Sequence, residues 1–163
     1  METIGTINVS EGTEINFFID EFKDVLYANI RKFATTEKYT GPTKQGIMLN
    51  HANLKEIIKK IDDNIDKFKK SDTSAKETLK LDDQRYINIA ITEFKEKKYF
   101  ELREYLESES YSGPTKKGIT INTDHFEKVL EFLKKMDEFL ANPPKDVVFE
   151  KKEEKKPSKK ENK

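Results

Sequence analysis

The sequence contains no cysteine, which excludes disulfide bonds, cysteine-bearing zinc sites and thiol catalysis. It also lacks a run of about 18 apolar residues, so we expect no transmembrane helix and no membrane partner. The opening residues, METIGTINVSEG, have neither the basic start nor the apolar block of a signal peptide, and we expect none. The chemistry of this chain must therefore come from its polar, charged and aromatic side chains.

Net charge is absent as well, because 31 Lys and Arg residues balance 31 Asp and Glu residues. Attraction of the whole protein to nucleic acid is therefore not expected, and a basic surface can arise only from the arrangement of the cations. The two histidines, His51 and His125, do not occupy equivalent places in the repeat described below. No carboxylates show the spacing of a metal or acid–base site. We expect no enzyme, no metal and no cofactor.

An internal repeat organises the chain. The stretch YTGPTKQGIMLN begins at Tyr39, and YSGPTKKGITIN begins 72 residues later, at Tyr111. The same shift places residues 15–68 on residues 87–140 without a gap. A repeat of this size marks a structural unit that does not bury its apolar face alone. We predict a first unit over residues 1–70, a linker over 71–77, a second unit over 78–142 and a charged, disordered tail over 143–163.

Each unit changes its apolar period once. Isoleucine or phenylalanine recurs at every second position over residues 15–19 and 87–91, alternating with Asn16, Phe18 and Asp20 and with Asn88, Ala90 and Thr92, which is typical of half-buried strands. Strands are also expected at residues 7–9, 27–33 and 47–49, with a hairpin turn at FKDV and a Gly-Pro turn before the last strand. A period of 3.6 follows, with Asn50 and Asn122 as N-caps. We predict an α+β fold of two tandem β-β-β-β-α repeats, each an antiparallel sheet with one C-terminal helix over one face.

The sheet face without a helix carries aromatic and basic residues in alternation. In the first unit these are Tyr27, Arg31 and Phe33, and their equivalents are Tyr99, Arg103 and Tyr105. Rings that stack on bases and cations that follow phosphates are typical of proteins that bind single strands. Tyr and Phe are also common in strands for packing alone. The residues by themselves leave both interpretations open.

The second unit resembles a known family. RYINIAITEFKEKKYFELREYLE, followed by SGPTKKGITIN and an amphipathic helix, is similar to the core domain of the transcriptional coactivator positive cofactor four. The first unit, with IRKF and TKQGI, is a weaker match. The resemblance implies binding of single-stranded DNA with little sequence preference, in transcription, replication or repair. It also implies a dimer of curved four-stranded sheets, so we expect the two units to form a pseudo-dimer within one monomeric chain.

The strand pattern and the resemblance together predict the binding residues. They are Phe22, Lys23, Tyr27, Arg31, Phe33, Lys44, Phe94, Lys95, Lys97, Tyr99, Arg103, Tyr105, Lys116 and Lys117. The resemblance also implies a stacking tryptophan, but Ala34 and Leu106 occupy its two positions. We expect the second groove to be the more basic, because Val25 and Gln45 replace two of its lysines in the first. Substitutions of Phe94 and Arg103 should then weaken binding more than those of Phe22 and Arg31.

Two alternatives remain from the sequence. One is a DNA or RNA binder of the purine-rich-element-binding or Whirly type, which shares the β-β-β-β-α plan. The other is a protein–protein adaptor that has lost nucleic-acid binding, which the acidic residues Glu101 and Glu104 and the zero net charge favour. RNA, transcription proteins and replication proteins are further candidate partners. The location is the nucleus in a eukaryote and the cytoplasm or nucleoid otherwise, and the sequence does not decide between them.

Overall fold

A computed structural model describes residues 1–149 of the chain. The first repeat contains β1 (Glu2–Ser10), β2 (Thr13–Phe22), β3 (Val25–Thr35), β4 (Thr40–Leu49), α1 (His51–Asp63) and α2 (Ile65–Lys69). The second contains β5 (Lys76–Lys80), β6 (Arg85–Phe94), β7 (Lys97–Glu107), β8 (Ser112–Asn122), the short 3₁₀ helix η1 (Thr123–His125) and α3 (Phe126–Ala141). The predicted α+β class and the duplicated order of four strands and a helix are confirmed.

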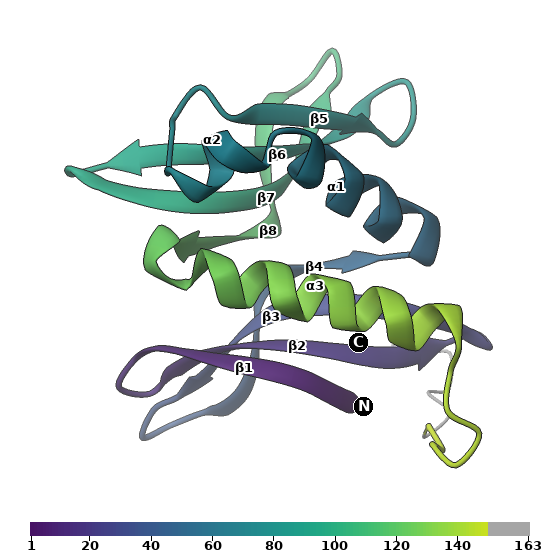
Figure 1. Cartoon of the computed structure of the whole chain (residues 1–163). Helices are drawn as coiled ribbons and strands as arrows, with labels where there is room; N and C mark the ends of the chain where they lie inside the picture. Colours follow the sequence, from purple (N-terminus) through teal and green to yellow (C-terminus); the bar gives the residue numbers. More distant parts are fainter. Residues whose placement is uncertain (150–163) are drawn as a thin grey trace.

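The strands form one eight-stranded sheet in the order β1-β2-β3-β4-β8-β7-β6-β5. Within each repeat the neighbouring strands are antiparallel, as expected for strands joined by short turns. The repeats meet at β4 and β8, which pair in parallel at Gly46 and Lys117. The sheet is therefore two curved halves joined at a narrow seam, with the predicted pseudo-twofold arrangement (Figure 1).

Tight hairpins connect the second and third strand of each half. Lys23 and Asp24 have φ values of 53° and 66°, and Lys95 and Glu96 have 51° and 68°. Two consecutive positive φ angles define the two-residue turn whose twist matches that of the flanking strands. The turn predicted at FKDV is confirmed, and the equivalent FKEK of the second repeat forms the same turn. The two turns place Phe22 and Phe94 at the ends of long β-ribbons.

The repeated Gly-Pro is not the turn that the sequence predicted. Gly41 and Pro42 lie inside β4, opposite Ala34 and Phe33 of β3, and Gly113 and Pro114 take the same places in β8. The true turn is the four-residue segment before each strand, where the N–H of Thr36 donates to the carbonyl of Tyr39 at 2.7 Å. Proline is tolerated here because the register shifts beside it, which relieves the need for a ladder hydrogen bond.

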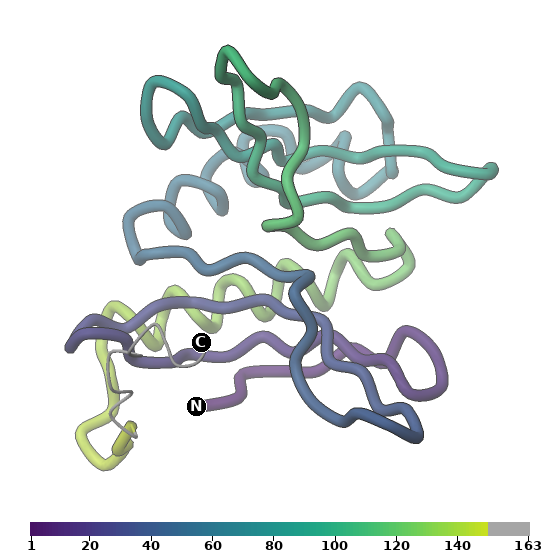
Figure 2. Tube along the Cα trace, turned by 180° about the vertical axis from the view of Figure 1, so that it is seen from behind, coloured from purple at the N-terminus to yellow at the C-terminus, as the bar shows by residue number. Residues whose placement is uncertain are grey.

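The helices are exchanged between the halves, which corrects the expectation that each covers the sheet of its own unit. The helix α3 of the second repeat packs across β1, β2 and β3 of the first, whereas α1 contacts α3, β5 and its own β3 (Figures 1 and 2). The ring of Phe132 lies 5.1 Å from that of Phe17, and a Cβ on Gly5 would come within 2.4 Å of the Phe132 ring. An apolar stripe shows that a helix is covered, but not by which sheet.

The two repeats consequently share one core. Phe68 of the first repeat is fully buried, and its ring lies 6.0 Å from the rings of both Phe100 and Phe126 in the second. Neither repeat buries its apolar surface without the other.

Both predicted N-cap residues cap a helix. Asn50 caps α1 by accepting the N–H of Asn53 at 2.8 Å, and Asn122 caps η1 by accepting the N–H of Asp124.

The boundaries of the repeats differ slightly from the predicted ones. The strand β5 begins at Lys76, inside the expected linker, and Ala75 is fully buried while its carbonyl accepts the N–H of Ile91. Beyond α3, the ring of Phe149 meets that of Phe139 at 6.4 Å. Residues 150–163 of the predicted tail lie outside the described residues. Over residues 1–149, none of the helices has the length and apolar character needed to cross a bilayer.

Candidate nucleic-acid interface

The face of each half-sheet that points away from the helices carries the predicted binding residues. Side chains alternate across a strand, and the core takes Ala28 and Ile30 in β3 and Phe100 and Leu102 in β7. The residues between them therefore point to the opposite face, which we call the outer face. It carries Tyr27, Arg31 and Phe33 in the first half and Tyr99, Arg103 and Tyr105 in the second. The sequence assigned all six to this face correctly.

The hairpin tips present the most exposed rings. Phe22 is 40% exposed and Phe94 is 64% exposed. Each ring has the ammonium of the following lysine over it, at 5.3 Å for Lys23 and 5.4 Å for Lys95. A solvated ring with its own cation can stack on a base while the cation lies near a phosphate.

Lysines add to the charge of the second half. Lys97, Lys116 and Lys117 are all exposed, and so is Lys44 in the first half.

The two faces also have different polar networks around their central arginines. In the second half, all three nitrogens of Arg103 donate: Nε to Glu101 at 3.1 Å, one terminal nitrogen to the carbonyl of Thr115 at 2.9 Å, and the other to the hydroxyl of Thr120 at 3.3 Å. The carboxylate of Glu101 also accepts from the amide of Asn88. Arg103 is thus held firmly, and part of its charge is neutralised.

The central arginine of the first half has different neighbours. Arg31 donates to the carbonyl of Thr43 at 2.9 Å, which repeats the bond from Arg103 to Thr115. The position equivalent to Glu101 is Asn29, which brings no negative charge. We therefore no longer expect substitution of Arg103 to weaken binding more than substitution of Arg31. The more basic half is also the half in which the arginine is paired with a carboxylate.

The aromatic residues in mid-strand are held by neighbouring rings. Tyr105 stacks on Tyr86 across the strands at 5.3 Å, and Phe33 meets Phe18 edge-on at 6.2 Å. Burial, and then the charge of Glu101, raise the pKa of Tyr105. Phe33 and Tyr105 are therefore partly packed against neighbouring rings. Packing within the sheet, which the sequence left open as an alternative to base stacking, accounts for part of the surface of each ring.

The outer faces continue across the seam into two clefts. The first, of about 500 Å³, is lined by Arg31 and Met48 of the first half and by Arg85, Glu104 and Lys117 of the second, among others. Arg85 and Glu104 were not predicted as site residues. The first copy has Thr13 and Lys32 at the equivalent positions, so this pair occurs only in the second. An arginine at the start of a strand, present in only one copy, was the signal for this site.

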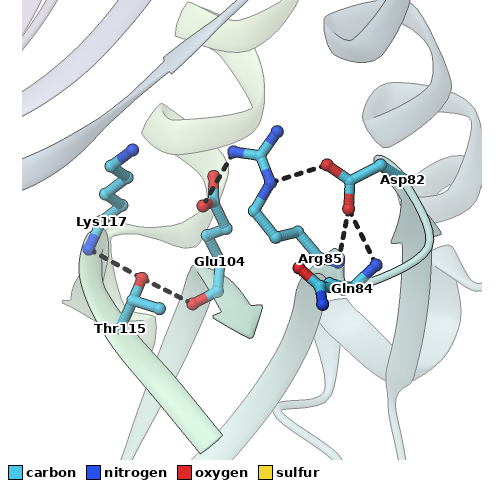
Figure 3. A network of polar contacts seen from close by, with 6 residues as sticks. All are labelled: Asp82, Gln84, Arg85, Glu104, Thr115 and Lys117. Carbon is cyan, nitrogen blue, oxygen red and sulfur yellow. Dashed lines mark hydrogen bonds and ion pairs between the residues drawn. The ribbon is translucent and has the colours of Figure 1, made fainter. Parts of the chain in front are cut away.

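Polar contacts fix the side chains of this cleft (Figure 3). Arg85 donates to Asp82 at 2.9 Å and lies 3.4 Å from Glu104. The Oδ1 of Asp82 accepts the backbone N–H groups of Gln84 and Arg85, which lowers the pKa of Asp82 together with the arginine side chain. The loop thus orients Arg85 toward the seam, where Lys117 also points (Figure 3).

The second cleft is the pseudo-symmetric counterpart of the first. It has a volume of about 410 Å³ and brings Lys32 of the first half to Lys97, Tyr99 and His125 of the second. Each outer face is therefore completed by residues of the opposite half. This arrangement requires both copies of the repeat in one folded unit.

The described residues show no arrangement typical of a metal site, since no group of three His, Cys, Asp or Glu side chains gathers over residues 1–149. His51 lies 2.6 Å from Asp137, so it connects the start of α1 to the last turns of α3. His125 lines the second cleft.

A comparison with protein families assigns the repeat. The family Transcriptional Coactivator p15 (PC4) matches residues 9–60 and again residues 79–132, which together make up more than half of the chain. The chain belongs to the PC4 family. The two matches confirm the tandem resemblance, and they contain all fourteen predicted binding residues.

Solved structures similar to part of the chain include two crystal structures of MoSub1. The MoSub1–DNA complex, described as showing a novel DNA-binding mode, is 25% identical, with a TM-score of 0.33, and the match covers 47% of this chain and 96% of that one. The MoSub1–ssDNA complex in phosphate buffer has the same identity and TM-score, and the match covers 47% of this chain and 90% of that one. The comparison with curated proteins found no match.

Proposed function

We propose that this PC4-family protein binds single-stranded DNA with little sequence preference and acts in the regulation of transcription. The observation that carries the proposal is the duplicated outer face, on which an exposed Phe-Lys hairpin tip and a fixed central arginine recur in both halves. Family membership supports a role as a transcriptional coactivator. Duplex DNA buries its bases in the stack, so exposed rings of this kind favour an unpaired strand.

The fourteen predicted residues have distinct roles in this proposal. Phe22 and Phe94 stack on bases, and the lysines beside them attract phosphates. Arg31 and Arg103 bind the backbone at the centre of each face, while Tyr27, Tyr99, Phe33 and Tyr105 form its aromatic floor. The remaining lysines, Lys44, Lys97, Lys116 and Lys117, extend the basic surface along β4, β7 and β8, and Arg85 adds a further cation at the seam.

Binding must come from local arrangement, because the chain has zero net charge. Stacking contributes about 1–3 kcal/mol per base, so two exposed rings are enough to favour a single strand even without long-range attraction. RNA offers the same rings and phosphates, and a function in replication or repair needs the same unpaired strand. We place the protein in the nucleus if its source is a eukaryote, and in the cytoplasm or nucleoid otherwise, without a catalytic role.

A competition assay tests the proposal. Purified protein is titrated into labelled single-stranded oligodeoxythymidine, and unlabelled single-stranded DNA, duplex DNA and RNA compete for it. We expect single-stranded DNA to compete best and the logarithm of the affinity to fall with that of salt at a slope of roughly −0.7 per phosphate contact. The absence of measurable binding to any of the three nucleic acids, even at low salt, would instead support the protein–protein adaptor.

A further inference from the structure

We propose that Tyr39 and Tyr111 are stacking platforms for nucleobases, and that Tyr111 together with Arg103 and Lys116 forms a subsite for one nucleotide of a single strand. The proposal rests on the proposed function and names two residues that the binding pattern of the strands did not include. Both are the first letter of the repeated stretch, YTGP in one half and YSGP in the other.

The repeated Tyr-x-Gly-Pro fixes the tyrosine ring against its own strand. The hydroxyl of Tyr111 donates to the carbonyl of Pro114 at 2.5 Å, and the hydroxyl of Tyr39 donates to the carbonyl of Pro42. A bond between residues three apart brings the ring back over the glycine that separates them. The backbone turn before each strand supports this position, since the carbonyl of Tyr111 accepts the N–H of Ser108 at 2.8 Å.

The glycine of the motif makes room for the ring. A Cβ on Gly113 would lie 3.2 Å from the Tyr111 hydroxyl oxygen and 3.6 Å from the ring carbon that bears it. For Gly41 and Tyr39 the same distances are 3.0 and 3.4 Å. Both glycines also have a φ near +150°, which side chains rarely adopt. Glycine is therefore favoured at both positions by its backbone conformation, and a side chain there would also press against the tyrosine hydroxyl.

Although both rings are fixed, they are not buried. Tyr39 remains 50% exposed and Tyr111 remains 47% exposed. A ring that only filled a core would be covered, whereas these keep a large part of their surface in solvent. A fixed and solvated ring is a preorganised stacking surface, because little conformational freedom is lost when a base covers it.

Charge and shape around Tyr111 suit a nucleotide. A cleft of about 470 Å³ is lined by Arg103, Leu106, Tyr111, Pro114, Thr115 and Lys116. Tyr111, Leu106 and Pro114 supply apolar surface for a base, while Arg103 and Lys116 supply cations for its phosphate. Cleft volumes of about 300–1,000 Å³ are usual for small ligands, and one nucleotide falls in this class. The cleft thus combines the two chemistries that a nucleotide presents.

The first half repeats the platform with one difference. Tyr39, Pro42 and Lys44 correspond to Tyr111, Pro114 and Lys116, but Ala34 replaces Leu106. Alanine offers a smaller apolar wall beside the ring. The first platform should therefore contribute less than the second.

The experiment measures the affinity of the full chain for labelled oligodeoxythymidine by fluorescence anisotropy. Tyr111→Leu keeps apolar bulk but loses the aromatic face, and we expect affinity to fall roughly 5- to 100-fold with an unchanged salt slope. Tyr111→Phe keeps the stacking ring but loses the bond to Pro114 that fixes it, so we expect a smaller loss than for Tyr111→Leu. Tyr39→Leu should cause a smaller loss than Tyr111→Leu. Thermal unfolding of each variant reports whether the hairpin still folds.

Photocrosslinking provides a second measurement that does not depend on folding of a variant. An oligonucleotide with 5-iododeoxyuridine should crosslink to the peptides that contain Tyr39 and Tyr111. The inference is overturned if the parent protein binds the strand while Tyr111→Leu binds equally well, or if neither peptide is crosslinked. Failure of the parent protein to bind any single strand overturns the proposed function itself.

Discussion

Arg103 forms an ion pair with Glu101 on the outer face of the second half, with Nε 3.1 Å from the carboxylate oxygen. Both side chains are mostly covered, at 19% and 14% exposure. In the first half, Asn29 stands where Glu101 would be, and Arg31 has no such partner at that position. The two faces of this pseudo-dimer are therefore equal in fold and unequal in charge.

Glu101→Gln should strengthen binding of single-stranded DNA by about 2- to 5-fold, because it removes a negative charge beside the bound DNA. An exposed charge pair contributes roughly 0.2–1 kcal/mol. The amide oxygen of the glutamine can still accept the bond from the Asn88 amide, so the fold of the strand should not change. Fluorescence anisotropy at two salt concentrations measures the effect. Glu127→Gln on α3 removes the same charge far from the outer face and should leave affinity unchanged.

Asn29→Glu is the reciprocal substitution. It should weaken binding by about 2- to 5-fold, since it would pair Arg31 as Glu101 pairs Arg103. The same anisotropy titration applies, with Asn29→Gln as the matched neutral control. Equal affinity of the Glu and Gln variants would contradict a role for the charge at this position.

Phe94→Ala should reduce affinity more than Phe22→Ala, and each loss should fall within about 1–3 kcal/mol. Phe94 is the more exposed ring and has Lys97 nearby, where the first half has Val25. Isothermal titration with oligodeoxythymidine measures both. For the arginines we now expect Arg31→Ala to cost at least as much as Arg103→Ala, because Glu101 neutralises part of the Arg103 charge. A larger loss for Arg103→Ala would restore the expectation from the sequence.

Phe68→Ala should destabilise the whole chain by about 3–5 kcal/mol, because this fully buried ring of the first repeat contacts two rings of the second. Chemical denaturation should still show one transition, since the exchanged helices unite the two halves in one core. Phe22→Ala, at an exposed hairpin tip, should change the free energy of unfolding by only about 0.5 kcal/mol. Two separate transitions in the parent protein would indicate halves that fold independently.

The chain should have the mass of a single copy in light scattering at all concentrations, because the second repeat occupies the place that a partner subunit would take. Twice that mass would show that the pairing occurs between chains. The same measurement with added oligonucleotide gives the number of strands bound by each chain.

The sequence by itself determined the duplication, the strand and helix pattern, and the face on which Arg31 and Arg103 lie. These follow from local rules, because side chains alternate along a strand and recur every 3.6 residues along a helix. The hairpins that follow Phe22 and Phe94 were also predictable, because a short polar break separates two strand patterns there. Gly-Pro misled the prediction because its usual place is a turn, whereas here the glycine accommodates a tyrosine ring inside a strand.

Only the tertiary structure decided which sheet each helix covers and that Arg85 and Lys117 line one cleft with Arg31 at the seam. These contacts join residues far apart in the chain. The apolar stripe of a helix can pack on any apolar surface of the right shape, and a charged side chain can pair with any opposite charge nearby. Local pattern therefore fixes the elements and their faces, while the packing of one repeat on the other fixes the site.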